Sequence, residues 1–143
     1  MADAVSNNIA VVLRYFDACN TGALDELKAT LHPEVIHYFL PPSFATIEGA
    51  DHLARYWRKY KLALDPVWKI DRIIGQGDQV VSEWSCLWTD PASSRRVMSR
   101  GTEWYEMRDG LIAEVRAYFV AGSHDSELPG FPYAERRYLT RAQ

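Results

Sequence analysis

Glu103 is the residue whose setting in this sequence most clearly favours acid–base chemistry. It lies in a segment, 97–107, that alternates as a strand does, and a second alternating segment follows at 111–120. Side chains of a strand point alternately to its two faces, so Glu103 can share a face with apolar neighbours, which are Tyr105, Ala113, Val115, Ala117 and Phe119. A carboxyl group among such neighbours is desolvated and its pKa rises, so it can donate or shuttle a proton near neutral pH.

The face on which Glu103 lies depends on the turn Arg108-Asp109-Gly110 between the two segments. A two-residue turn would place Glu103 opposite Arg116 as an exposed ion pair, whereas a three-residue loop with a bulge would place it opposite Val115. We favour the second register because it gathers the apolar side chains on one face. The alternative for Glu103 is a plain strand carboxylate paired with Arg100 or Arg116.

The composition is that of a single globular domain spanning residues 1–143. The net charge of −3 and the lack of a basic cluster argue against nucleic acid as a partner. Five Trp and eight Tyr are typical of an aromatic-lined pocket or an aromatic interface. We see no signal or membrane-spanning pattern, and Cys19 and Cys86 lack metal-ligand spacing, so we expect a cytoplasmic protein with free thiols and no metal.

The rest of the chain must position Glu103. Helical periodicity predicts helices at 6–20, 24–31 and 49–62, with Ser6 as the first cap, Gly22 ending the first helix and Pro33 stopping the second. Alternation predicts strands at 35–40, 67–74, 80–89, 97–107 and 111–120, followed by an irregular tail that packs down. This order predicts an α+β fold, in which a curved antiparallel sheet wraps around the helices and leaves a cone-shaped cavity.

The order of elements, with the phrases LRYFDACNTGALDEL, IEGADHLARYWRKY and MRDGLIAEVRAYFV, resembles the nuclear transport factor 2-like superfamily over roughly residues 8–120. Its relevant branches are the SnoaL-like polyketide cyclases and the ketosteroid isomerases. The resemblance implies a cystatin-like α+β barrel with a central pocket. It says less about chemistry, because the superfamily includes hydrolases, isomerases, dehydratases and pure binding modules.

Two of the catalytic positions of the steroid isomerases agree with this sequence, and a third does not. Tyr15 matches the tyrosine that donates a hydrogen bond to the substrate oxygen, and Glu103 matches the protonated carboxylic acid that is the second donor. The catalytic aspartate of these enzymes falls on about Phe39, but His37 lies two residues earlier on the same strand face and could accept a proton. The structural alternatives are a core-edge histidine bonded to the backbone and a helix tyrosine that fills the cone.

The epoxide hydrolases of the superfamily are a poorer match. Their final strand resembles IAEVRAYFV, but their catalytic aspartate falls on Ala117, and their arginine and second aspartate fall on Trp84 and Cys86. We therefore do not expect epoxide hydrolysis by that mechanism. The resemblance places Phe119 on the pocket wall and Trp57 near the hydrogen-bonded network, and the predicted substrate-binding residues are Phe16, Phe39, Trp57, Trp84, Cys86, Trp88, Tyr105, Val115, Ala117 and Phe119.

The resulting hypothesis is a cofactor-free enzyme, an isomerase or a lyase-type dehydratase or cyclase, that acts on a small, hydrophobic carbonyl compound. Tyr15 and neutral Glu103 would stabilise negative charge on the substrate oxygen, and His37 would move the proton. The alternative is a non-catalytic carrier of a hydrophobic ligand, which the missing aspartate favours.

We also expect a homodimer. Trp68, Trp104 and Tyr118 would be exposed on the convex side of the sheet and would suit a second copy.

Overall fold

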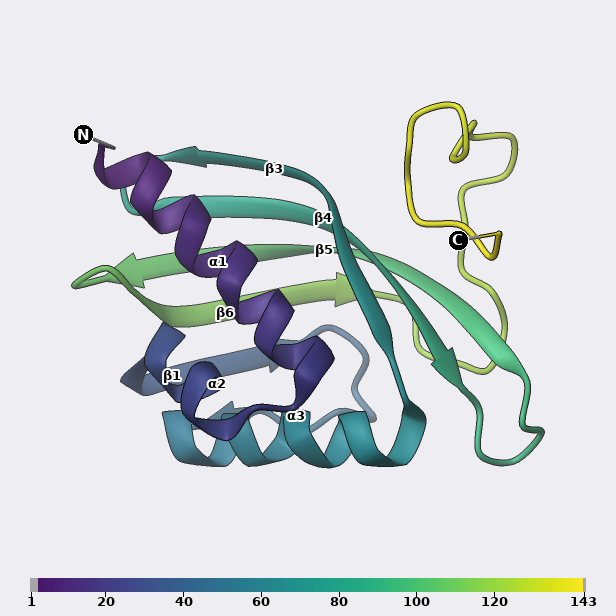
Figure 1. The fold of residues 1–143 in the computed structure, drawn as a ribbon, viewed down its shortest axis with the longest axis horizontal. Coiled ribbons are helices and arrows are strands. Elements are labelled where there is room, and N and C mark those ends of the chain that lie inside the picture. Colours follow the sequence, from purple (N-terminus) through teal and green to yellow (C-terminus); the bar gives the residue numbers. More distant parts are fainter. Residues whose placement is uncertain (1–2, 143) are drawn as a thin grey trace.

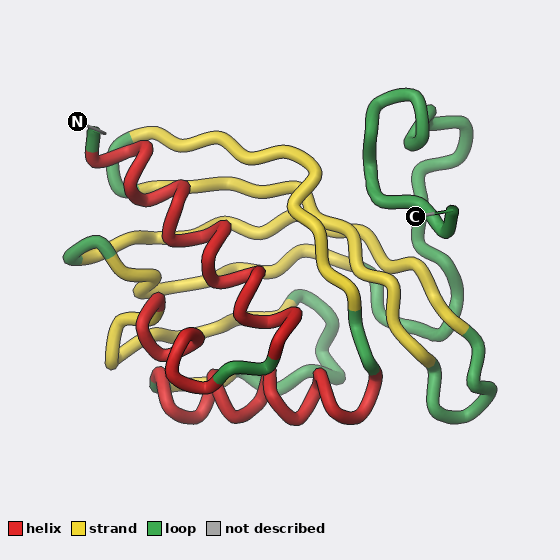
Figure 2. Tube along the Cα trace, in the orientation of Figure 1, coloured by secondary structure: helices red, strands yellow, loops and turns green. Residues whose placement is uncertain are grey.

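Three helices lie against one side of a curved six-stranded sheet, as Figure 1 shows for the computed structural model, which describes residues 3–142. The elements are α1 (Ala4–Thr21), α2 (Leu24–Thr30), β1 (Leu31–Phe39), β2 (Ile47–Glu48), α3 (Ala50–Leu64), β3 (Val67–Gln76), β4 (Gln79–Thr89), β5 (Arg96–Arg108) and β6 (Leu111–Phe119). The strand order is β2-β1-β6-β5-β4-β3, with β1 parallel to β6 and the other neighbours antiparallel. The expected α+β fold is confirmed, and the sheet stays open between its edge strands β2 and β3 (Figure 2).

Helix α1 crosses the inner face of the sheet, and α3 runs along its β1 edge (Figure 1). The predicted cap of α1 is wrong by three residues: Asp3 is the cap, and its carboxylate accepts the Ser6 backbone N–H at 2.7 Å. A carboxylate just before the first turn is as good a cap as serine, and Asp3 lies nearer the start of the helix. Gly22 ends α1 in the left-handed conformation, as predicted.

The prediction that Pro33 stops the second helix is wrong. Helix α2 already ends at Thr30, and the chain enters β1 directly. A proline cannot donate a hydrogen bond to a strand ladder. Pro33 lies where the pairing of β1 with β6 is irregular, between the paired residues Leu31 and Ile36, so no regular ladder bond is lost. Strand β2 was missed, since two residues are too short for an alternating pattern.

The hairpin between β5 and β6 has a different turn from the one we predicted. Only Asp109 and Gly110 lie between the strands, and both have positive φ, 56° and 73°, as a type I′ turn requires. The extra residue of the bulge is Ala113 in β6, because the register shifts there.

Glu103 therefore pairs with Ala117 and not with Val115, so the predicted register is wrong. The bulge shifts the pairing by one residue and so restores the predicted face. Glu103 lies on the inner face of the sheet among buried side chains.

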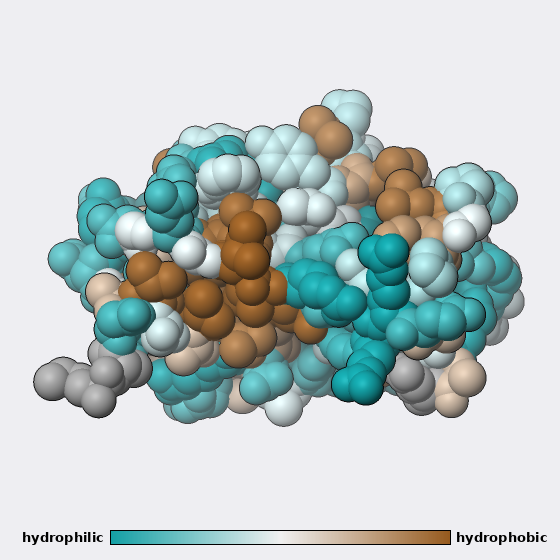
Figure 3. Space-filling view, turned by 90° about the horizontal axis from the view of Figure 1, so that it is seen from above, coloured by the Kyte–Doolittle hydropathy of each residue, from teal (hydrophilic) through white to brown (hydrophobic). Residues whose placement is uncertain are grey.

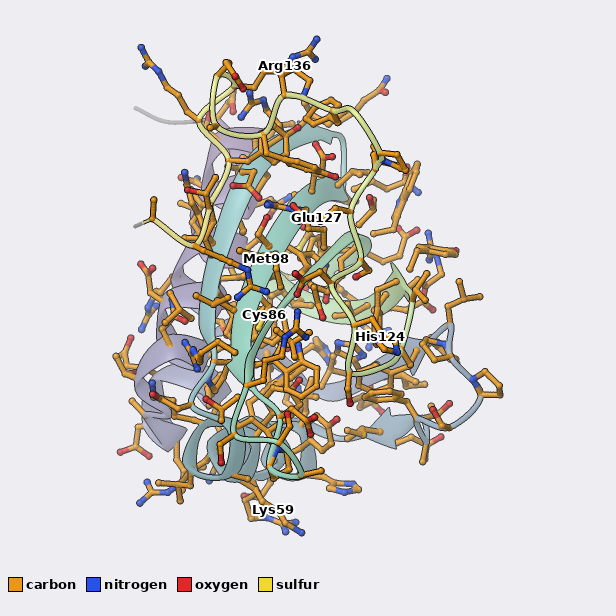
Figure 4. All side chains as sticks on the ribbon, turned by 90° about the vertical axis from the view of Figure 1, so that its right-hand side faces the viewer. Lys59, Cys86, Met98, His124, Glu127 and Arg136 are labelled. Carbon is orange, nitrogen blue, oxygen red and sulfur yellow. The ribbon has the colours of Figure 1, made fainter. Side chains whose placement is uncertain are left out.

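The C-terminal segment, residues 120–142, runs from the end of β6 onto the outer face of the sheet near β3, β4 and β5 (Figures 1 and 4). Tyr138 and Leu139 are buried there. The backbone N–H of Leu139 donates to Asp71 and its carbonyl accepts from Arg100, both at 2.9 Å. The prediction that the tail packs down is confirmed.

The outer face of the sheet is partly apolar. Trp104 and Tyr118 are exposed, as predicted, but Trp68 faces inward, because it pairs with the buried Cys86 and paired residues share a face. The homodimer stays a prediction. Figure 3, viewed onto the β3 side, shows further hydrophobic residues gathered over α1 and β3, where Ile74 is exposed. None of the helices within residues 3–142 is long and apolar enough to cross a bilayer.

Candidate functional site

A cavity of about 590 Å³ opens between α3, the inner face of the sheet and the segment after β6. Its wall is aromatic: Phe39, Phe44, Tyr56, Trp57, Tyr60, Trp68, Trp84, Trp88 and Phe119. The other lining residues are Ser43, Leu64, Cys86, Ser99, Glu103, Ala117, Val120, Ala121, Gly122 and Ser123. Figure 4 shows the end of the molecule where the C-terminal segment passes, with Cys86 in its middle. The volume and the wall are those of a site for a small, largely apolar molecule.

Most of the predicted substrate-binding residues lie on this wall, namely Phe39, Trp57, Trp84, Cys86, Trp88, Ala117 and Phe119. Three do not. Phe16 borders a separate small void, whereas Tyr105 and Val115 are fully buried beneath the wall. Both are on the inner face of the sheet, but α1 covers the part of that face nearest the β5–β6 turn (Figure 1), so an inward residue there belongs to the core.

Several wall residues were missed. Tyr56 and Tyr60 lie on α3 with Trp57 at helical spacing, and this cluster of aromatic residues was the signal that could have found them. The residues from the two connecting segments, 43–44 and 120–123, have no periodicity from which their position could be predicted.

Glu103 brings a titratable group to the cavity. Its side chain lies on the wall but is only 3% exposed. Burial raises its pKa to about 7, and a hydrogen bond from the Tyr105 hydroxyl to Oε2, at 2.8 Å, lowers the pKa by a smaller amount. The carboxyl is thus close to half-ionised at neutral pH, which suits a group that both accepts and donates a proton.

Glu103 differs from the other titratable groups on this wall because its charge changes near neutral pH. Among residues 3–142, no lysine, arginine or histidine side chain lines the cavity. Burial raises the pKa values of Tyr56, Tyr60 and Cys86, so these three stay neutral.

Tyr15 approaches Glu103 but not the main cavity. Both residues border a void of about 10 Å³, whose wall shares Trp57, Trp68 and Glu103 with the main cavity. The Tyr15 hydroxyl accepts a hydrogen bond from the indole nitrogen of Trp57, and burial raises its pKa well above the usual value. Tyr15 therefore lies behind the wall, on the α1 side of Glu103.

His37 is fully buried and lies outside the cavity lining. Its ring stacks on Phe39, with 4.2 Å between ring centroids, and Phe39 forms the wall. Neither ring nitrogen has a hydrogen-bond partner among the described residues. Burial lowers the pKa of His37 to about 3, so the ring is neutral across the physiological range. The structure does not bring His37 together with Tyr15 and Glu103.

Gly101 sets the position of Trp84 on the wall. The two residues pair across β4 and β5, and the Trp84 indole lies over the glycine. A Cβ atom on Gly101 would lie 2.5 Å from Trp84 Cζ2 and 2.8 Å from the carbonyl oxygen of Tyr118. Only a glycine leaves room for this indole.

Comparison with known proteins places the chain in a family. The family model described as SnoaL-like domain matches residues 12–115. No curated protein matches the chain.

Solved structures share the fold of this chain. A protein of unknown function with a cystatin-like fold from Methylobium petroleophilum PM1 has 26% identity and a TM-score of 0.71, over 94% of this chain and 92% of that one. An epoxide hydrolase from M. tuberculosis, described as LEH-like, has 23% identity and a TM-score of 0.73, over 82% and 86%. An NTF2-like protein of unknown function from Burkholderia pseudomallei K96243 has 18% identity and a TM-score of 0.71, over 80% and 91%. The last two likenesses concern the fold alone.

Proposed function

Because this chain belongs to the SnoaL-like domain family, we propose that it is a cofactor-free enzyme that performs acid–base chemistry on a hydrophobic carbonyl compound bound in the cavity. The reaction would be of the isomerase or lyase type. The observation that carries the proposal is the carboxyl of Glu103, which lies on an aromatic wall and has a pKa of about 7. A catalytic acid or base works best when its pKa lies near the operating pH.

Glu103 is the group that moves the proton in this proposal. Ionised Glu103 removes a proton from the carbon next to the substrate carbonyl; the C–H bond breaks, and its electron pair delocalises onto the carbonyl oxygen as an enolate. The protonated carboxyl then returns the proton to another atom of the substrate. We assign this step to Glu103 and not to His37, because the His37 ring lies behind Phe39 and has no hydrogen-bonded path to the cavity among residues 3–142.

The cavity wall carries hydroxyl groups that could bind the substrate oxygen, among them those of Tyr56, Tyr60 and Ser99. Ser99 lines the cavity, and its hydroxyl oxygen accepts a hydrogen bond from the Trp88 indole at 2.8 Å, which leaves the hydroxyl proton free for a ligand. Tyr15 keeps its expected role as a donor only where a substrate reaches past Trp57 into the small void.

Epoxide hydrolysis by the mechanism considered above is not part of the proposal. The positions matched to its charged residues are Ala117, Trp84 and Cys86, and all three lie on the cavity wall. Apolar or neutral side chains there offer no second carboxylate to activate water.

The experiment measures deuterium exchange into hydrophobic ketones in D₂O, beginning with 2-tetralone, by proton NMR. We expect exchange above the buffer rate, increasing with pH through about 7 as Glu103 ionises. Glu103→Gln keeps the shape of the side chain and should lower the rate by about 100-fold or more. Glu106→Gln, which changes a glutamate on the outer face of the same strand, should leave the rate unchanged.

The second candidate is a non-catalytic carrier of a hydrophobic ligand. It is favoured by one observation: two of the three predicted catalytic side chains, Tyr15 and His37, do not line the cavity. Ketones that bind by calorimetry, but exchange no faster than in buffer at any pH, would establish the carrier and refute the enzyme.

A further inference from the structure

We propose that Tyr105 and Ser82 are positioning residues for Glu103, joined in a directed hydrogen-bond chain that holds Oε2 of the carboxyl and leaves Oε1 to react. The importance of the chain rests on the proposed function. Its geometry does not, and it can be tested without a substrate.

The direction of the chain follows from the number of protons. The Tyr105 hydroxyl donates to Glu103 Oε2 at 2.8 Å. A hydroxyl has only one proton, so the second bond of this oxygen, to Ser82 Oγ at 2.8 Å, must be donated by Ser82. The chain therefore runs from Ser82 through Tyr105 to Glu103, and each hydroxyl polarises the next.

The chain is fixed by the sheet. Ser82 of β4 pairs directly with Glu103 of β5, so the two side chains share the inner face. Tyr105 lies two residues further along β5, on the same face, and its ring is enclosed by the core. Ser82, Tyr105 and Glu103 are 1%, 0% and 3% exposed, so bulk water does not compete for these bonds.

The chain decides which oxygen of Glu103 reacts. Oε2 accepts from Tyr105, and among the described residues no group bonds Oε1. The proton that Glu103 gains is therefore carried on Oε1. Oε1 is thus the oxygen that exchanges protons, while Oε2 is anchored.

The chain also adjusts the acidity of the carboxyl. Burial pushes the pKa upward, and the bond from Tyr105 stabilises the charged form and opposes that rise. Without the bond, the pKa of Glu103 would lie above neutrality. The carboxyl would then stay protonated at neutral pH and could not act as a base.

The test measures the pKa of Glu103 directly. Protein labelled with ¹³C at the glutamate carboxyl carbon is titrated by NMR, and the signal of Glu103 is identified by its loss in Glu103→Gln. We expect Tyr105→Phe to raise this pKa by about one unit or more, because a charge-stabilising donor is removed. Ser82→Ala should raise it by less, because Tyr105 still donates but is no longer polarised.

A matched control removes a tyrosine–glutamate hydrogen bond elsewhere. The Tyr138 hydroxyl donates to Glu83 on the outer face of the sheet. Tyr138→Phe should leave the pKa of Glu103 where it is in the wild type.

The proposal is overturned if the pKa of Glu103 in folded Tyr105→Phe is equal to the wild-type value or lower. If Tyr105→Phe does not fold, Ser82→Ala decides alone, and an unchanged Glu103 pKa in that variant is the contrary result. A raised pKa together with no ketone exchange in the wild type would refute the proposed function and leave the positioning chain intact.

Discussion

Glu103 faces Ala117 directly across the β5–β6 ladder. The methyl group of Ala117 offers neither charge nor a hydrogen bond, and both residues line the cavity. Burial and the single bond from Tyr105 are therefore what set the acidity of the carboxyl. This pairing results from a two-residue turn followed by a bulge, so the backbone of the hairpin places the acid next to an apolar partner.

Replacing Glu103 by glutamine should change how stability depends on pH. The pKa of Glu103 is raised to about 7 from the usual 4.5, so the folded protein binds a proton that the unfolded chain releases between these values. The free energy of unfolding of the wild type should fall by about 3 kcal/mol as pH rises through this window, and the fall is complete above about pH 7. Urea unfolding of Glu103→Gln should show no such fall. The stability of the variant relative to the wild type therefore increases with rising pH. A parallel decline in both proteins would contradict the burial of a neutral acid.

Replacing His37 by phenylalanine should change stability with the opposite dependence on pH. Its pKa is lowered to about 3 from 6.5, so the unfolded chain takes up a proton below about pH 6.5 that the folded protein does not bind. The free energy of unfolding of the wild type should fall by up to about 5 kcal/mol as pH falls towards 3. His37→Phe should be more stable than the wild type at about pH 5, with the gain shrinking towards pH 7. Between about pH 4.5 and 6.5 the His37 and Glu103 contributions oppose each other in the wild type. An equal gain at every pH would assign the effect to packing and not to titration.

Adding a methyl group at Gly101 should destabilise the protein by about 1–3 kcal/mol. The new Cβ would meet Trp84 Cζ2 at 2.5 Å, and the indole would have to move into the cavity. A double-mutant cycle, followed by urea unfolding, separates this contact from the clash with the Tyr118 carbonyl. Gly101→Ala should cost less in the Trp84→Phe background than in the wild type. Equal costs in the two backgrounds would show that Trp84 does not depend on the glycine.

The fold could be predicted because its long elements carry strong periodicity. The alternation in residues 67–120 predicted the four strands of the meander, and their bounds are correct to within two residues. Short or irregular elements could not be predicted, since β2 has two residues and the bulge at Ala113 leaves no mark in the sequence. The turn was misjudged because Asp109-Gly110 fits both of the loops that we considered.

The candidate site could be predicted only in part. The burial of Glu103 followed from its apolar neighbours, and this is confirmed by its 3% exposure. Alternation tells which face a side chain is on, but it does not tell whether α1 or the cavity covers that face, so Tyr105 and Val115 were placed on the wall. His37 was given a catalytic role because it shares a strand face with Phe39, but its ring stacks against Phe39 and lies outside the cavity lining. The catalytic roles of Tyr15, His37 and Glu103 stay predictions.

The distribution of the five tryptophans has a practical consequence. Trp57, Trp68, Trp84 and Trp88 all line the cavity, while Trp104 lies on the outer face of the sheet. A molecule that enters the cavity therefore changes the surroundings of four indoles at once and leaves the fifth untouched. The intrinsic fluorescence of the protein thus reports occupancy of the cavity without any label, and Trp104 supplies a constant background against which each compound can be screened.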